Sequence, residues 1–179
     1  MKKTVTPFTA QLVTFTTTLP FAEVIARLDA EVNKPRSLQF LAKLSTASTR
    51  EEIVDLVEST TGGNDFLYFM ELNHDKWINI YHADAADTTP PPAAPAVVYT
   101  IGNPLIAETF MRLDIRAGHQ IPPRLMIAAN ADRTTSVSYH RPSSLVVHLA
   151  PENAALAHAM AVLDDKLERM VERITADAL

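Results

Sequence analysis

The chain of 179 residues has no cysteine and only four glycines, at positions 62, 63, 102 and 118. Without cysteine it has no disulfide framework, no thiolate nucleophile and no cysteine-based zinc or iron–sulfur site. Its glycines are too few and too far apart to form a G-x-G-x-x-G turn, a P-loop or a G-x-S-x-G nucleophile elbow. These absences exclude the commonest nucleotide-binding motifs and several classes of hydrolase.

The chain also lacks long apolar runs and clusters of basic residues. Sixteen Lys and Arg and 21 Asp and Glu give a net charge of −5 and are scattered along the chain. Nucleic acids and anionic membranes are bound through clustered Lys and Arg, so neither is an expected partner. No apolar segment approaches the ~20 residues that a membrane helix needs. We expect a cytoplasmic protein of one domain, residues 1–179, large enough to bury about 70% of its unfolded surface.

The first third of the chain predicts one strand followed by helices. Val, Phe and Thr alternate within residues 8–18, which is typical of a strand. A helix begins at Pro20, and the apolar patch 38–44 predicts a second, shorter helix. Thr49 and Glu52 have the spacing of a capping box, so a third helix begins there.

The next segment predicts a hairpin and then a loop. Residues 66–72 and 77–82 are rich in aromatic and aliphatic side chains and are joined by the short polar link 73–76, which favours two paired strands. Residues 83–95 carry four prolines among Ala, Asp and Thr. Because proline cannot donate to a sheet or continue a helix, we expect an exposed loop there.

The stretch from Ala96 to Ser144 has clear turn and cap residues between its predicted elements, and the rest of the chain is arranged around it. It reads as a strand at 97–101, a turn at Gly102-Asn103-Pro104 and a helix that ends at Gly118, followed by strands at 124–129 and 134–139. Asn is a good N-cap, and Pro fits the first position of a helix, where its missing N–H costs nothing.

From Pro151 onward the sequence predicts one long helix. Its apolar residues recur at alternating spacings of four and three, an a/d pattern over nearly three heptads. These residues are Leu156, Met160, Leu163, Leu167, Met170 and Ile174. Either this stripe packs across a sheet within the chain, or it pairs with the same helix of a second copy. Both contacts can occur together.

These elements together predict an α+β fold, in which a curved, mainly antiparallel sheet of about six strands packs against helices. One face of the sheet is aliphatic, as at Ile78 and Ile80, and would meet the helices. The other face carries aromatic, hydroxyl and amide groups: Trp77, Asn79, Tyr81, Thr14, Thr16, Thr18, Ser136, Ser138 and His140. Such a face suits a ligand cavity, a polar dimer contact or plain solvent.

One group of residues is a candidate for chemistry. If the strands pair as neighbours, Tyr139, His140 and Arg141 come near Asn103 and Arg124. His140 would then act as a general base, with an arginine holding an anionic group and Tyr139 orienting it. The structural alternative is that Tyr139 packs, Asn103 caps a helix and the arginines are solvated. The full set of candidate ligand-binding residues is Asn103, Arg124, Tyr139, His140, Arg141, Trp77 and Tyr81.

The six histidines show neither H-x-H nor H-x-x-x-H spacing, which would place two imidazoles on one face of a strand or helix. The sequence therefore predicts no metal site, and it predicts no cofactor.

Three segments taken in order, Ile101–Pro104, Pro123–Ile127 and Val137–Tyr139 with Pro142, resemble the family known as domain of unknown function 302. The resemblance covers about residues 77–144. It implies an α+β fold of the TATA-box-binding-protein-like class, usually found as a dimer. The family has no established biochemical activity, so the resemblance implies a fold and leaves the function open.

Three hypotheses for function follow. The first is a homodimeric protein that binds a small molecule between sheet and helices. The second is an enzyme that acts on a small anionic substrate with His140 as general base. The third is an interaction protein that dimerises through its C-terminal helix.

Overall fold

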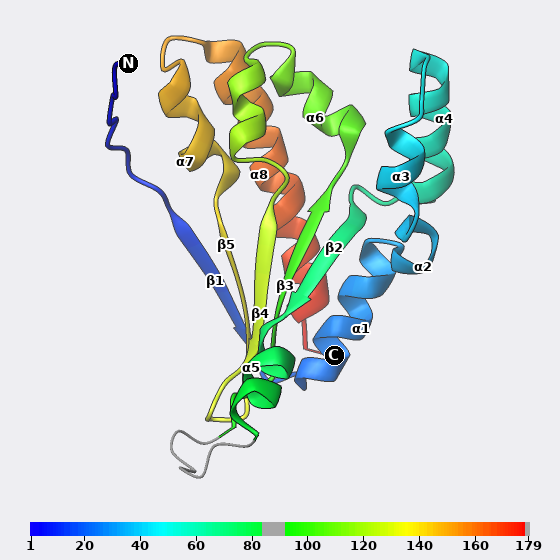
Figure 1. The fold of residues 1–179 in the computed structure, drawn as a ribbon, viewed down its shortest axis with the longest axis vertical. Helices are drawn as coiled ribbons and strands as arrows, with labels where there is room; N and C mark the ends of the chain where they lie inside the picture. Colours follow the sequence, from blue (N-terminus) through cyan, green and yellow to red (C-terminus); the bar gives the residue numbers. More distant parts are fainter. Residues whose placement is uncertain (84–91, 178–179) are drawn as a thin grey trace.

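A five-stranded antiparallel sheet with helices against one of its faces forms the centre of the computed structural model, which describes residues 1–83 and 92–177 (Figure 1). The strands lie in the order β1-β5-β4-β3-β2. Their bounds are β1 (Leu12–Thr17), β2 (Leu67–Asn73), β3 (Ala96–Gly102), β4 (Arg124–Ala129) and β5 (Thr135–His140). The predicted α+β class and antiparallel sheet are confirmed, with five strands in place of about six.

The helices fill the connections between these strands. They are α1 (Phe21–Glu31), α2 (Lys34–Ser37), α3 (Phe40–Leu44), α4 (Arg50–Thr61), α5 (His74–His82), α6 (Pro104–Met111), α7 (Pro142–Val146) and α8 (Ala154–Thr175), with 3-10 helices at Ile115–His119 and Val147–Leu149. The predicted capping box is present, because the N–H of Glu52 donates to Thr49 Oγ1 at 3.1 Å and the N–H of Thr49 to Glu52 Oε2 at 3.3 Å. Gly62, at φ +60°, ends α4 in the left-handed region that glycine tolerates.

Alternation along the strands separates a covered face from an uncovered face. In β3 the side chains of Val97, Tyr99 and Ile101 point to the helices and are at most 2% exposed. The long helix α8 runs behind the sheet beside α1, as Figure 1 shows. The main core lies between these two helices and the sheet. A smaller cluster of Phe40, Val57 and Leu67 joins α3 and α4 to β2.

The apolar stripe of α8 lies inside this core. All six of its residues are 0–2% exposed within the chain. The interpretation that the stripe packs across the sheet is therefore confirmed, and these side chains are not available to pair with a second copy.

The segment from Trp77 to His82 was predicted to be a strand, and this prediction is wrong. It belongs to helix α5, at the end of the sheet where β3 begins (Figure 1). Tertiary hydrogen bonds fix it there, because Asp75 Oδ1 accepts from the N–H of Ala96 and Asn79 exchanges two hydrogen bonds with the backbone of Ala93. Short apolar runs fit either period, and these contacts decide in favour of the helix.

Ile78 and Ile80 therefore do not lie on a sheet face, and neither do the three α5 residues assigned to the opposite face. Trp77, Ile80 and Tyr81 share the spacing of one helix side and are 57–78% exposed.

Two other elements are shorter than predicted. β1 begins at Leu12, and the preceding residues form no strand. α6 ends at Met111 because Asp114 starts a separate 3-10 helix by accepting a hydrogen bond from the N–H of Arg116 at 2.9 Å. Gly118 has no positive φ and is not a left-handed stop. Most of the predicted loop 83–95 lies outside the described residues.

The uncovered face brings together the hydroxyl-bearing residues predicted to share it. Thr14 pairs with Ser138, and Thr16 pairs with Ser136, across β1 and β5. Thr18 lies beyond the end of β1 and donates to Asp177 instead. The polar face was thus correctly predicted for the residues of β1 and β5.

Candidate functional site

A pocket at the end of the uncovered face brings together two residues predicted from the sequence, Arg124 and His140. Arg124 begins β4 and His140 ends β5. Met126 of β4 pairs with Ser138 of β5, and the two candidate residues lie two positions further along on each strand. Because side chains alternate with a period of two, Arg124 and His140 point to the same face.

Apolar groups form the walls of this pocket, which has a volume of about 280 Å³. They come from the N-terminal segment, the segment before β4 and helix α7: Phe8, Ile121, Pro122, Pro123, Pro142 and Leu145. The ring of Phe8 is held by stacking on His148, with ring centroids 4.1 Å apart. The N-terminal segment is also tied to the strand end, since Gln11 O accepts from the N–H of Arg141 at 2.8 Å.

The approach of Pro122 to the sheet depends on a glycine. A Cβ on Gly102 would lie 2.7 Å from Cε2 of Phe69 and 3.3 Å from Cβ of Pro122. A side chain at this position would force the Phe69 ring to move and would press on Pro122, and glycine avoids both contacts. The predicted Gly-Asn-Pro turn thus positions one wall of the pocket as well as the start of α6.

Three polar side chains line the pocket, those of Gln120, Arg124 and His140, and the last two are uncommitted. Neither Arg124 nor His140 makes a side-chain hydrogen bond or ion pair with any residue of the described ranges, 1–83 and 92–177. Both are exposed. An uncommitted guanidinium keeps its planar set of N–H donors available for a carboxylate or phosphate.

The other members of the predicted group have structural roles. Asn103 Oδ1 accepts from the N–H of Leu105 at 2.9 Å, and its Nδ2 donates to Asp65 O at 3.0 Å. Tyr139 is 3% exposed, on the covered face. Arg141 pairs with Glu168 of α8 at 3.4 Å.

Tyr139 is also chemically unsuited to proton transfer near neutral pH. Burial, with the nearby Glu168, raises the pKa of Tyr139 to about 12. Trp77 and Tyr81, the remaining candidates, lie on α5 at the opposite end of the sheet from His140 (Figure 1). The sequence-predicted group is therefore reduced to Arg124 and His140.

A second polar cluster was missed by the sequence analysis. Lys34 of α2 donates to Glu71 Oε2 at 2.7 Å, to Tyr99 Oη at 2.8 Å and to Asp29 Oδ2 at 3.3 Å. Tyr99 Oη in turn donates to Asp29 Oδ1 at 2.7 Å. The partners come from α1, α2, β2 and β3, and no local motif joins them, so only the docking of α2 on the sheet could have revealed the cluster.

The pKa shifts in the Lys34 cluster follow from this geometry. Burial alone would lower the pKa of Lys34, but its hydrogen bonds to the carboxylates of Glu71 and Asp29 outweigh the burial, so the pKa is raised. Burial alone would raise the pKa of Glu71, but Lys34 and Tyr99 hold it below its ordinary value. Burial, with the carboxylates of Asp29 and Glu71, strongly raises the pKa of Tyr99. All three ammonium N–H groups of Lys34 have acceptors within the chain. The cluster therefore serves to hold α1 and α2 against strands β2 and β3.

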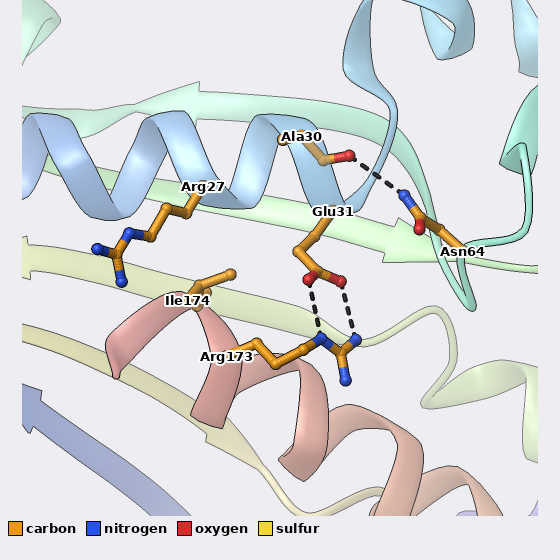
Figure 2. A pocket seen from close by; sticks show the side chains of 6 residues that line it. All are labelled: Arg27, Ala30, Glu31, Asn64, Arg173 and Ile174. Atoms are coloured by element: carbon orange, nitrogen blue, oxygen red, sulfur yellow. Dashed lines mark hydrogen bonds and ion pairs between the residues drawn. The ribbon is translucent and has the colours of Figure 1, made fainter. Parts of the chain in front are cut away.

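The polar side chains that line a groove between α1 and α8, drawn in Figure 2, are likewise bonded within the chain. Arg173 makes two hydrogen bonds of 2.8 Å to the carboxylate of Glu31. Arg27 donates to Glu23 and to Ala176 O, and Asn64 donates to Ala30 O. The groove has a volume of about 380 Å³, but its charged groups already hold the end of α8 against α1.

Two features are absent from residues 1–83 and 92–177, the part of the chain that the structure describes. No group of three or more His, Asp or Glu side chains there is arranged to hold a metal ion. None of the described helices has the length and apolar character needed to cross a bilayer.

These features define an α+β protein with one helix-covered and one uncovered face of a five-stranded antiparallel sheet. The chain belongs to the family described as domain of unknown function DUF302, whose family model matches residues 42–174. Among solved structures, it is similar to the crystal structure of an uncharacterized conserved DUF302 protein from Bacillus stearothermophilus. The two share 15% sequence identity with a TM-score of 0.60, over 91% of this chain and 97% of that one, which shows a common fold. The search of curated proteins found no match.

Proposed function

We propose that this protein binds a small molecule that has an anionic group and an apolar body, in the pocket of Arg124 and His140. The observation that carries the proposal is that the side chains of Arg124 and His140 make no hydrogen bond or ion pair within the described chain, while the residues around them are apolar except for Gln120. Ligand sites commonly combine apolar walls with a few converging polar groups.

The chemistry of the pocket favours a carboxylate or phosphate as the anionic group. A guanidinium presents parallel N–H donors that match either group, and such charge-assisted hydrogen bonds are about twice as strong as neutral ones. His140 adds a second donor or acceptor on the same face. The volume of about 280 Å³ lies just below the ~300–1,000 Å³ typical of drug-sized ligands, so a small ligand fits best.

Binding is a better supported function than catalysis. A general base needs a partner that orients its imidazole, and His140 has none among the described residues. The phenol of Tyr139, which was expected to help, lies on the opposite face of the sheet. The enzyme hypothesis with His140 as base therefore remains the second choice.

The test uses two probes of equal shape and different charge, benzoate and benzamide. Titrations followed by NMR amide shifts should show benzoate perturbing residues around Arg124 and His140, with benzamide binding more weakly. Arg124→Gln should weaken benzoate binding at least ~10-fold, because a hydrogen bond to a charged group contributes ~1.5–3 kcal/mol.

The matched control is Arg169→Gln, since Arg169 is an exposed arginine of α8, outside the pocket. It should leave benzoate binding unchanged. Equal effects of the two substitutions, or equal affinity for both probes, would contradict an anion site in this pocket.

A further inference from the structure

The two edge strands of the sheet, β2 and β1, differ in how their outer backbone groups are covered. At the β2 edge the N–H of Tyr68 donates to Val32 O at 3.1 Å, and a bulge shifts the register between Tyr68 and Met70. Glu71 of the same strand is paired with Lys34. Cover, bulges and charges are the usual means by which a protein keeps an edge strand from pairing with another chain. The β2 edge is therefore closed.

The β1 edge is open. Its strand Leu12–Thr17 contains no proline, its register with β5 is continuous, and residues 4–22 include no Asp, Glu, Lys, Arg or His. β1 is the outermost strand on one side of the sheet (Figure 1). Among the described elements it packs mainly on β5 and, on the covered face, on α8. Within the part of the chain that the structure describes, no element lies along its outer side.

The pairing of β1 with β5 determines which backbone groups face this open edge. The N–H of Arg141 donates to Gln11 O at 2.8 Å, and these two residues stand opposite each other when the β1–β5 register is extended by one. Hydrogen-bonded positions alternate along an antiparallel pair, so the odd-numbered residues of β1 bond to β5. The N–H and C=O groups of Leu12, Thr14 and Thr16 therefore point outward. No hydrogen bond joins them to another residue of the ranges 1–83 and 92–177.

We infer that the β1 edge binds an extended peptide segment of another protein, which adds to the five-stranded sheet as a further strand. The outward groups themselves define this partner. Donors and acceptors that alternate along a strand match the backbone of a second extended chain, and such pairing is a known mode of peptide recognition. A helix does not fit, because its backbone groups are already bonded to one another.

The side chains of β1 define the preferred sequence of the bound segment. Val13 and Phe15 are half-buried and pack against the main core. An added strand would cover their remaining exposed area, so we expect apolar residues at alternate positions of the segment. Beside Thr14 and Thr16, which are exposed on the other face, β-branched or hydroxyl residues fit. The net charge of −5 disfavours an acidic segment.

This inference is separate from the proposed ligand site. The pocket of Arg124 and His140 lies at the ends of β4 and β5, whereas strand addition uses backbone groups on the outer side of β1. Arg124→Gln should therefore weaken benzoate binding and leave peptide binding unchanged. Failure of either proposal leaves the other standing.

The experiment is amide hydrogen exchange, followed by NMR on the full chain with two peptides. The probe is an acetylated and amidated octapeptide in which valine and threonine alternate between terminal lysines. The control peptide has proline at its two central positions and cannot pair along a strand. Without peptide, the amides of Leu12, Thr14 and Thr16 should exchange faster than those of Val13 and Phe15. The probe, added from micromolar to millimolar concentration, should slow exchange of the first three at least ~10-fold, and the control peptide should not.

A proline substitution in β1 tests the outward groups directly. Thr14→Pro removes one outward N–H and leaves the hydrogen bonds to β5 in place, so the dissociation constant of the probe should rise at least ~10-fold. Thr16→Pro has the same design and replaces it if circular dichroism shows that Thr14→Pro does not fold. The matched control Thr4→Pro, at an exposed position before β1, should leave probe binding unchanged. If neither β1 variant folds, the two peptides on the unmodified chain decide.

Three results would overturn the inference. The first is that the probe at millimolar concentration does not slow exchange at Leu12, Thr14 and Thr16. The second is that the proline peptide slows it equally. The third is that exchange at these residues slows with rising protein concentration in the absence of peptide, because a second copy of the chain would then occupy the edge.

Discussion

The Lys34 cluster and the Arg124 pocket both place cationic side chains beside aromatic or apolar groups, but they differ in what those cations bind. Lys34 has three protein acceptors within 3.3 Å. Arg124 has no side-chain partner among the residues that the structure describes. A cation whose donors are all satisfied within the chain stabilises the fold, while one with open donors is available to a ligand.

The largest expected effect comes from removing the cation of the Lys34 cluster. Lys34→Met keeps the apolar stem and leaves the carboxylates of Asp29 and Glu71 facing each other without a counter-charge. Breaking a fully buried pair costs ~3–5 kcal/mol, and we expect about 2–3 kcal/mol here because the side chains keep some exposure. That exposure is 21% for Lys34, 33% for Asp29 and 26% for Glu71. Urea unfolding measures the loss.

The control for this substitution is Lys43→Met, at an exposed lysine of α3. It should change the free energy of unfolding by no more than about 0.5 kcal/mol. Equal stability of the two variants would show that the Lys34 cluster contributes nothing to the fold, and the contrast between the two regions would fail.

A smaller loss of stability than that of Lys34→Met should distinguish the two buried tyrosines, Tyr99 and Tyr139. Tyr99→Phe removes the oxygen that accepts from Lys34 and donates to Asp29, so we expect a loss of about 1–2 kcal/mol. Tyr139→Phe is the matched control, because no hydrogen bond joins the Tyr139 hydroxyl to another described residue, and it should lie within about 0.5 kcal/mol of the parent. A larger loss in Tyr139→Phe than in Tyr99→Phe, by thermal or urea unfolding, would reverse this assignment.

Much of the fold could be predicted because its signals are local. The capping box at Thr49, the Asn103 cap and the alternation in β3 to β5 each depend on residues a few positions apart. Helix α5 could not be predicted, because Asp75 and Asn79 stabilise the helix by hydrogen bonds to backbone groups that lie 21 and 14 residues away in the chain, respectively. Local propensity there favours a strand.

Two residues of the candidate site could be predicted from the sequence for the same reason. Arg124 and His140 belong to neighbouring strands joined by a short turn, so their proximity follows from antiparallel pairing. Alternation also determines that Tyr139 must point away from His140, which the predicted catalytic group overlooked. Lys34 and Tyr99 are 65 residues apart and meet only through tertiary docking, which no pattern in the sequence encodes.

The dependence of stability on pH below 4.5 gives a further test of the Lys34 cluster. The pKa of Glu71 lies below its ordinary value of 4.5 in the folded chain, since the bonds from Lys34 and Tyr99 outweigh its burial. Between the folded and the ordinary pKa the unfolded chain binds more protons, so this contribution is complete above pH 4.5 and is lost as the pH falls through the folded pKa. Glu71→Gln should therefore lose less stability than the parent on acidification below pH 4.5.

The urea concentration at the unfolding midpoint, determined at several pH values, measures this loss of stability on acidification. Glu51→Gln is the control, because Glu51 is an exposed glutamate of α4. Parallel curves for the parent and Glu71→Gln would show that Glu71 is not held ionised by the Lys34 cluster.

The smallest effect on stability is expected in the Arg124 pocket. Arg124→Met removes an exposed cation with no protein partner in the described chain, so the free energy of unfolding should change by no more than about 0.5 kcal/mol. The same variant should lose its preference for benzoate over benzamide, because only the charge-assisted hydrogen bonds of the guanidinium distinguish the two probes. Stability and binding thus respond in opposite ways at Lys34 and Arg124. If Arg124→Met instead unfolded as readily as Lys34→Met, the guanidinium would be part of the fold, and its availability to a ligand would lose its physical basis.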